Sequence, residues 1–121
     1  MAAPARQRRI EGEIQRVLAE LIAREVKDPR VGAVTVTAVE LLPDMSGARV
    51  LVVPFGDRGD PEALLAGLTR AAGFLRGEVG RRLGLRHAPR LQFEIDASIE
   101  RAEKLTRLID EAVRSDADER R

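Results

Sequence analysis

Apolar residues recur at three- and four-residue steps in the first quarter of the chain. This spacing places them on one face of an amphipathic helix, which we expect to run from Arg9 to about Val26. Pro29 marks its end, because the residue before a proline resists helical angles. We expect residues 1–8 to form a flexible arm ahead of this helix.

Three later segments have patterns typical of β-strands. Residues 33–42 are rich in valine and threonine, and residues 48–55 are apolar on both faces. Residues 43–47 have the composition of a turn, which predicts that these two strands form a hairpin. Residues 90–97 alternate strictly between polar and apolar side chains, which predicts a strand with one buried face.

A second amphipathic helix is expected between the hairpin and the last strand. Asp60 followed by Pro61 indicates its start, because the aspartate can cap the helix and proline suits its first turn. An apolar stripe then continues from Leu64 to Leu83. Each glycine inside a helix costs about 1 kcal/mol relative to alanine, so repeated glycines predict two short helices with a kink near Gly73. The glycines of this stretch are Gly73, Gly77, Gly80 and Gly84.

The order of these segments predicts an α+β fold. A final helix, capped by Ser98, is expected after the last strand, and residues 115–121 form a polar tail. A single three-stranded sheet with helices on one face is the simplest way to bury the apolar stripes. At 121 residues the chain has room for one such domain, which we place at residues 9–114.

Composition excludes several classes of protein. The chain has no cysteine, which excludes disulfides, thiolate metal sites and cysteine nucleophiles. No apolar run approaches the roughly 20 residues that span a bilayer, and residues 1–9 lack the apolar segment of a secretory signal. We therefore expect a cytoplasmic protein that makes no membrane contact.

Positive charge is concentrated in one part of the chain. Residues 70–90 contain six arginines and one acid, although the whole chain carries a net charge of only +1. The planar fork of donors on arginine suits phosphate, so this stretch predicts contact with a polyanion. Five of its arginines are the predicted phosphate contacts, and two arginines of the first helix are secondary ones. They are Arg76, Arg81, Arg82, Arg86 and Arg90, followed by Arg9 and Arg16.

The sequence contains little that indicates catalysis. His87 is the only histidine, and without cysteines a transition-metal site is not expected. Glu94 and Asp96 lie on the same face of a strand and could form a carboxylate pair for acid–base chemistry, although a solvated sheet face has the same alternation. No phosphate loop, dinucleotide fingerprint or nucleophile elbow is present. We expect no enzymatic activity, no cofactor and no metal ion.

The aromatic residues favour a particular mode of RNA binding. Bases of single-stranded RNA usually stack on aromatic side chains, but we expect all three phenylalanines of this chain to be buried in the core. Any RNA would then be contacted mainly through its phosphates and its shape. The three residues are Phe55, Phe74 and Phe93.

The segment Ala71-Ala72-Gly73-Phe74-Leu75-Arg76 resembles the ribosome-binding factor A family. The resemblance extends from about Ile10 to Ala112, nearly the whole chain. Residues 27–32, the first strand and the hairpin also match the pattern of this family. Later matching positions are Leu85, Arg86, Pro89, Leu91, Phe93, Asp96, Ala97 and Ser98.

The resemblance implies a KH-like fold of the type II-like class, in which the first helix precedes the first strand. In this family an Ala-x-Gly kink between two helices replaces the Gly-x-x-Gly loop of ordinary KH domains, and Ala71 and Gly73 match that kink. The literal Gly-x-x-Gly at residues 77–80 leaves an ordinary phosphate-clamping loop as the alternative. Two positions depart from the family pattern. Leu42 stands where a polar residue is usual, and Pro54 interrupts the second strand.

The resemblance also implies a function. It implies a bacterial assembly factor that binds the free 30S ribosomal subunit and its 16S rRNA, supports 5′-end processing of this RNA, and leaves before translation. We expect a monomer without a small-molecule substrate. Two alternatives are a general KH-like module for another RNA, and a protein-interaction domain that dimerises through the final amphipathic helix.

Overall fold

The described part of the chain forms a three-stranded sheet with two long helices. The computed structural model describes residues 5–54, 60–98 and 106–114. Helix, strand, strand, helix and strand follow one another as predicted, which confirms the α+β class. The elements are α1 (Ala5–Glu25), β1 (Val34–Leu41), β2 (Gly47–Pro54), α2 (Pro61–Leu83) and β3 (Arg90–Ile95).

The sheet has the strand order β1-β2-β3, so β1 and β3 are its edges. Strands β1 and β2 pair antiparallel and form the predicted hairpin, whereas β2 and β3 pair in parallel. In the parallel pair Gly47 lies opposite Arg90. The turn of the hairpin and the first residue of β3 therefore lie at the same end of the sheet.

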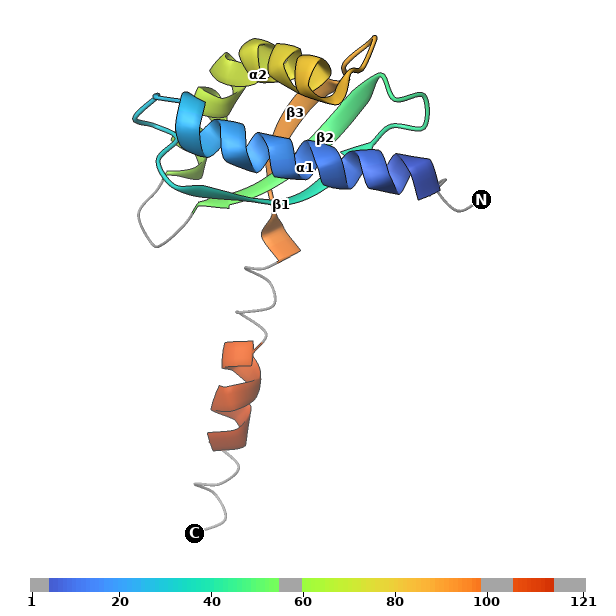
Figure 1. Ribbon diagram of the computed structural model, residues 1–121. Helices are drawn as coiled ribbons and strands as arrows, with labels where there is room; N and C mark the ends of the chain where they lie inside the picture. Colours follow the sequence, from blue (N-terminus) through green and yellow to red (C-terminus); the bar gives the residue numbers. More distant parts are fainter. Residues whose placement is uncertain (1–4, 55–59, 99–105, 115–121) are drawn as a thin grey trace.

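Both helices pack on one face of the sheet, α1 against β1 and α2 against β3 (Figure 1). Alternate strand residues point toward the helices and meet their apolar stripes. The opposite face carries the residues that alternate with them, such as Arg49, Gln92 and Glu94. Among the fully buried side chains are Ile14, Leu18, Val50, Val52, Leu68, Leu75 and Val79.

Helix α1 also covers the outer edge of β1 with polar side chains. Gln7, Glu11 and Gln15 follow one another at steps of four, so they lie on one side of the helix. Gln7 Nε2 donates to the Leu41 carbonyl oxygen at 3.1 Å, and Glu11 Oε2 accepts from the Leu41 N–H at 2.7 Å. Gln15 Nε2 donates to the Val36 carbonyl oxygen at 3.0 Å. These bonds satisfy backbone groups of β1 that do not pair with β2.

Helix α1 begins earlier than expected. It starts at Ala5, so residues 5–8, which we expected in a flexible arm, are helical. The hydrogen bond from Gln7 to β1 gives this first turn a tertiary contact. Residues 1–4 of the expected arm and the expected tail at 115–121 lie outside the described residues.

A single uninterrupted helix, α2, occupies the stretch in which two short helices were expected. Its axis bends in Figure 1, so the kink changes the direction of the helix without ending it. Gly77 and Gly80 lie inside α2, and their interpretation as a phosphate-clamping loop is therefore wrong. The predicted start is confirmed, because the side chain of Asp60 accepts a hydrogen bond from the Glu62 N–H at 3.0 Å.

The expected final helix is present at residues 106–114, but its side chains are exposed. Leu108 and Ile109 are both 53% exposed, and Val113 is 62% exposed. The apolar side of this segment therefore does not belong to the core. Near its expected start the cap is Asp96 rather than Ser98, because Asp96 Oδ1 accepts a hydrogen bond from the Ser98 N–H at 2.9 Å.

Candidate nucleic-acid interface

The connection between α2 and β3 is held firmly against the helix. Gly84 ends α2 with a φ of 63°, and the Leu85 N–H donates to the Gly80 carbonyl oxygen at 2.9 Å. A Cβ placed on Gly80 would lie 3.1 Å from the Cβ of Ala88, so glycine permits this close approach. Arg76 Nε donates to the Ala88 carbonyl oxygen at 3.0 Å. These contacts fix the position of the connection.

The five arginines predicted in this region divide into two groups. Arg81 is paired with Glu78, and Arg82 lies 3.7 Å from Glu78 and 4.0 Å from Glu20. The other three are exposed and have no ion pair with any carboxylate of the described ranges, so their charge is available to an external anion. The unpaired group consists of Arg76, Arg86 and Arg90.

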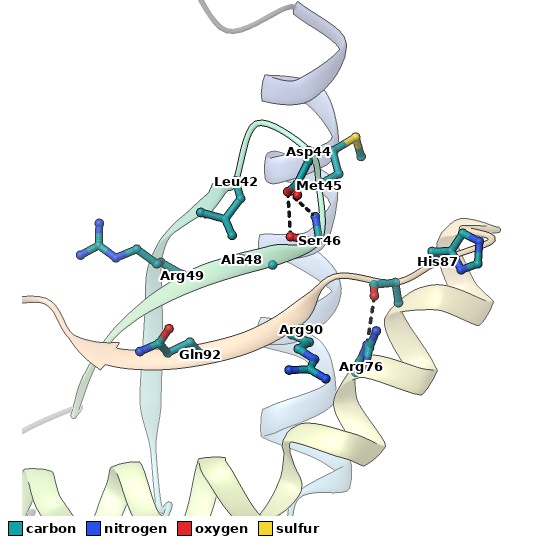
Figure 2. A pocket seen from close by; sticks show the side chains of 12 residues that line it. Leu42, Asp44, Met45, Ser46, Ala48, Arg49, Arg76, His87, Arg90 and Gln92 are labelled. Carbon is teal, nitrogen blue, oxygen red and sulfur yellow. Dashed lines mark hydrogen bonds between the residues drawn. The ribbon is translucent and has the colours of Figure 1, made fainter.

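Two of the unpaired arginines line a hollow at one end of the sheet, shown in Figure 2. The hollow has a volume of about 830 Å³ and lies between the turn of the β1–β2 hairpin and the α2–β3 connection. Arg76 reaches it from α2, and Arg90 from the first residue of β3. We call it the hairpin hollow, and its lining residues include Leu42, Asp44, Met45, Arg49, Arg76, His87, Arg90 and Gln92.

The hairpin turn forms an ordered wall of this hollow. The Met45 N–H donates to the Leu42 carbonyl oxygen at 2.8 Å, and the Leu42 N–H donates to the Gly47 carbonyl oxygen at 2.9 Å. Asp44 Oδ1 accepts from the Ser46 hydroxyl at 2.7 Å and from its N–H at 3.0 Å. These two bonds hold the pKa of the Asp44 carboxyl below its ordinary value. The turn is therefore shaped before any ligand arrives.

Arg49 also borders the hollow, but its charge is already compensated. Its Nε donates to Glu94 Oε2 at 2.7 Å, and its Nη1 donates to Glu40 Oε2 at 2.8 Å. The hydrogen bond to Glu94 raises the pKa of Arg49 and lowers the pKa of Glu94. Arg49 therefore holds three strands together across the open face of the sheet.

The proposed carboxylate pair of β3 is not arranged for acid–base chemistry. Glu94 is bound to Arg49, while Asp96 accepts hydrogen bonds from Ser98 and, at 2.6 Å, from the Thr37 hydroxyl. These partners, Ser98 first, lower the pKa of Asp96. Both carboxyls are therefore held in the ionised form and are poor proton donors near neutral pH.

The other predicted residues lie elsewhere on the surface. Arg9 and Arg16 line a separate shallow hollow on α1, together with Glu13, and the structure does not bring them into the hairpin hollow. Ala71 is half-buried against the core. Gly73 is exposed, and a Cβ placed on it would meet no described atom within 4 Å.

The phenylalanines differ from the expectation at one position. Phe93 is buried as predicted, but Phe74 is 50% exposed, so its predicted burial is wrong. Phe74 lies on α2 beside the buried stripe, next to Arg70 and Lys27 in a shallow depression. Phe55 lies outside the described residues.

Within the described ranges, no three histidine, cysteine, aspartate or glutamate side chains are grouped so that they could hold a metal ion. In the same ranges no helix has the length and apolar character that crossing a membrane requires.

Comparison with known proteins identifies the family. The family model of ribosome-binding factor A matches residues 6–109, a range that includes β1, β2, α2, β3 and all of α1 except its first residue. The chain belongs to the ribosome-binding factor A family. Its confirmed α+β class is thus also KH-like, because the solved structures of this family have that fold.

Individual relatives support this assignment. Ribosome-binding factor A of Azoarcus sp. (strain BH72) is 50% identical over 113 residues, which cover 93% of this chain and 89% of the relative. The crystal structure of ribosome-binding factor A from Thermus thermophilus is 36% identical with a TM-score of 0.66, covering 74% of this chain and 94% of that one. A T. thermophilus model fitted into a cryo-EM map of a 30S–RbfA complex is 36% identical with a TM-score of 0.62, covering 74% and 93%.

The hairpin hollow was not predicted from the sequence, nor were the exposed Leu42 and the ion-paired Arg49 in its walls. The hollow depends on the parallel register that places Gly47 opposite Arg90, and no local pattern encodes this register. Two signals were nevertheless visible. Leu42 is an apolar residue beside a turn, and Arg49 interrupts an apolar strand. Both positions indicate side chains on the open face or at the rim.

Proposed function

We propose that this chain is a non-enzymatic assembly factor of the small ribosomal subunit. It binds the free 30S subunit through 16S rRNA and supports late maturation, including processing of the 5′ end of that RNA. It acts in the cytoplasm as a monomer and uses no cofactor or small-molecule substrate.

One observation carries this proposal. A chain of the ribosome-binding factor A family exposes three arginines without carboxylate partners in the described ranges, around the end of α2 and the start of β3. A relative with 36% identity has been fitted into a map of its complex with the 30S subunit. Unpaired arginines on a fixed scaffold are suited to phosphates, because each offers a planar set of donors at no cost of breaking an ion pair.

The arrangement supports positioning more than sequence reading. Half or more of the hydrogen bonds in nucleic-acid complexes go to phosphate and sugar, and these fix register and orientation. Arg86 and Arg90 lie on either side of the buried Pro89, so the firmly held connection sets their separation. The bend in α2 sets the angle between this basic end and the surface around Gly73. Such a surface fits a folded RNA by its shape.

Sedimentation of a cell lysate through a sucrose gradient tests the proposal. We expect the protein to travel with free small subunits and not with assembled ribosomes, and to leave them as the salt concentration rises. Arg86→Glu should reduce this co-migration, whereas Arg24→Glu, which changes an arginine of α1 that is already ion-paired with Glu20, should not. Migration at the top of the gradient at low salt would contradict the proposal.

A protein-interaction domain remains the second candidate function, and the exposed apolar side chains of residues 106–114 favour it. A dimer through this helix would bury Leu108, Ile109 and Val113. Sedimentation equilibrium of the purified chain distinguishes the two. The second candidate predicts a dimer that dissociates on dilution and is lost in Leu108→Glu, while the first predicts a monomer at every concentration.

A further inference from the structure

The hairpin hollow contains two positive charges that no carboxylate of the described residues pairs with. Arg76 Nε is held by the Ala88 carbonyl oxygen, which orients the guanidinium and leaves its Nη groups for a ligand. The backbone of Arg90 is fixed by its N–H, which donates to the Ser46 carbonyl oxygen at 3.0 Å. Its side chain makes no hydrogen bond or ion pair with any residue that the structure describes. Figure 2 shows both arginines beside the start of β3.

The acids near these arginines do not neutralise them. Glu94 is ion-paired with Arg49. The Asp44 carboxylate keeps its negative charge, but it is bound by Ser46 in the hairpin turn and forms no ion pair with Arg76 or Arg90. An anion that enters the hollow therefore meets two uncompensated arginines. A phosphate that accepts hydrogen bonds from both gains charge-assisted contacts without breaking an ion pair.

An apolar surface faces the same space. Leu42 is 46% exposed and lines the hollow. Its Cδ1 lies 3.2 Å from the point where a Cβ on Gly47 would be, so the glycine lets Leu42 lie close over the start of β2. An exposed leucine beside two free arginines suits a ligand that is flat and apolar at one end and anionic at the other.

The hollow has the size of a ligand site, and its walls are ordered. A hollow of about 830 Å³ lies within the range of small-ligand sites, about 300–1,000 Å³. One wall is fixed by the hydrogen bonds of the hairpin turn and the other by those of the α2–β3 connection. Walls that are already ordered reduce the entropy lost on binding.

We propose that the hairpin hollow holds one unstacked nucleotide of RNA. Its phosphate accepts hydrogen bonds from Arg76 and Arg90, and the face of its base lies on Leu42. The inference rests on the proposed function and identifies where, within that interface, a base is contacted.

Affinity of the full-length chain for purified 30S subunits, measured at several salt concentrations, tests the phosphate contact. Arg90→Ala should weaken binding and reduce the slope of log affinity against log salt by about 0.7–0.9, the value for one lost phosphate contact. Arg24→Ala, which changes an exposed arginine outside the hollow, should leave the slope unchanged. Equal slopes for Arg90→Ala and the unchanged chain would overturn the proposal.

The base contact has its own test. Leu42→Ala should weaken 30S binding about fivefold, because a half-exposed leucine loses apolar contact area. Leu42→Phe should strengthen binding, because an aromatic ring stacks on a base. Leu108→Ala is the matched control, since Leu108 is also a half-exposed leucine and lies outside the hollow. Unchanged affinity in both Leu42 variants would overturn the base contact.

A photo-crosslinker at position 42 identifies the occupant. Benzoylphenylalanine in place of Leu42 should crosslink to one nucleotide of 16S rRNA in the 30S complex. A crosslink to a ribosomal protein, or to many scattered nucleotides, would contradict a single bound nucleotide while leaving the proposed function intact. If the unchanged chain does not bind 30S subunits at low salt, the proposed function fails, and this inference fails with it.

Discussion

The glycines of α2 lie in two different environments. A Cβ placed on Gly67 would lie 2.7 Å from Val31 Cγ2, and Gly80 lies similarly close to the α2–β3 connection. A Cβ placed on Gly73 or Gly77 would meet no described atom within 4 Å. Packing inside the described chain therefore explains why Gly67 and Gly80 are glycines. It does not explain Gly73 and Gly77.

This difference separates requirements of the fold from requirements of the surface. Gly67 lets the α1–β1 connection approach α2 and completes the core around Val31. Gly73 and Gly77 are one helical turn apart on an exposed surface beside Phe74, and each costs about 1 kcal/mol of helix stability relative to alanine. We propose that they serve the bend of α2 and a close approach of RNA in the proposed complex.

The largest effect is expected for Gly67→Val. The new side chain would overlap Val31, so the unfolding free energy should fall by about 2 kcal/mol. Urea denaturation followed by circular dichroism measures the change. Gly73→Val is the matched control, since the same substitution in open space should stay within about 0.5 kcal/mol of the unchanged chain. Equal losses in the two variants would remove the distinction between the two environments.

For binding to 30S subunits, the substitution at Gly73 should have the larger effect. Gly73→Val places a branched side chain on the exposed surface of α2 and should weaken 30S binding about tenfold, or about 1.4 kcal/mol, with little loss of fold stability. Titration of labelled protein with 30S subunits gives the affinity, and the urea experiment gives the stability. A loss of binding no greater than the loss of stability would assign Gly73 to the fold alone.

Gly84 tests the end of the same helix. Its φ of 63° lies in the left-handed region, where an alanine costs about 1 kcal/mol. Gly84→Ala should lower the unfolding free energy by about this amount, and Gly84→Asn by less, because asparagine tolerates this conformation. Identical losses would show that the left-handed conformation is not what limits this position.

The smallest effect is expected for the carboxylate of Asp28, which lies beside Gly67. Hydrogen bonds from the Arg30 guanidinium, and then one from the Arg30 backbone N–H, lower the pKa of Asp28 from 3.8 to about 2. Since the pKa is lower in the folded state, the ionised carboxylate stabilises the fold above about pH 3.8, and this contribution is lost as the pH falls toward 2. Arg30→Ala should therefore make stability less dependent on pH in this window.

Carbon-13 NMR of the Asp28 carboxyl provides the direct measurement. Its titration midpoint should lie near 2 in the unchanged chain and should rise toward the ordinary value in Arg30→Ala. An identical midpoint in both chains would show that Arg30 does not cause the shift.

Periodicity predicted the type and order of the elements, because burial of one face determines the helices and strands of this fold. It placed the start of α1 four residues late, and the glycines suggested two helices where α2 is continuous. The same stripe that includes Ala71 and Leu75 leaves Phe74 off the buried face, so its exposure was also encoded in the sequence. The site was harder to predict. Glu78 lies one helical turn before both Arg81 and Arg82. The ion pairs of these two arginines with Glu78 could therefore be expected from local spacing. The hairpin hollow depends on long-range register, which local spacing does not contain.

The side chains that cover the edge of β1 have a consequence for synthesis. Gln7, Glu11 and Gln15 precede β1 in the chain, so the groups that satisfy its outer backbone are made before the strand itself. An open strand edge is a template for pairing with another chain, and incompletely folded chains are most exposed to such aggregation. During translation, the side chains that cover this edge are therefore already present when β1 is made, and its protection from a neighbouring nascent chain does not depend on later residues.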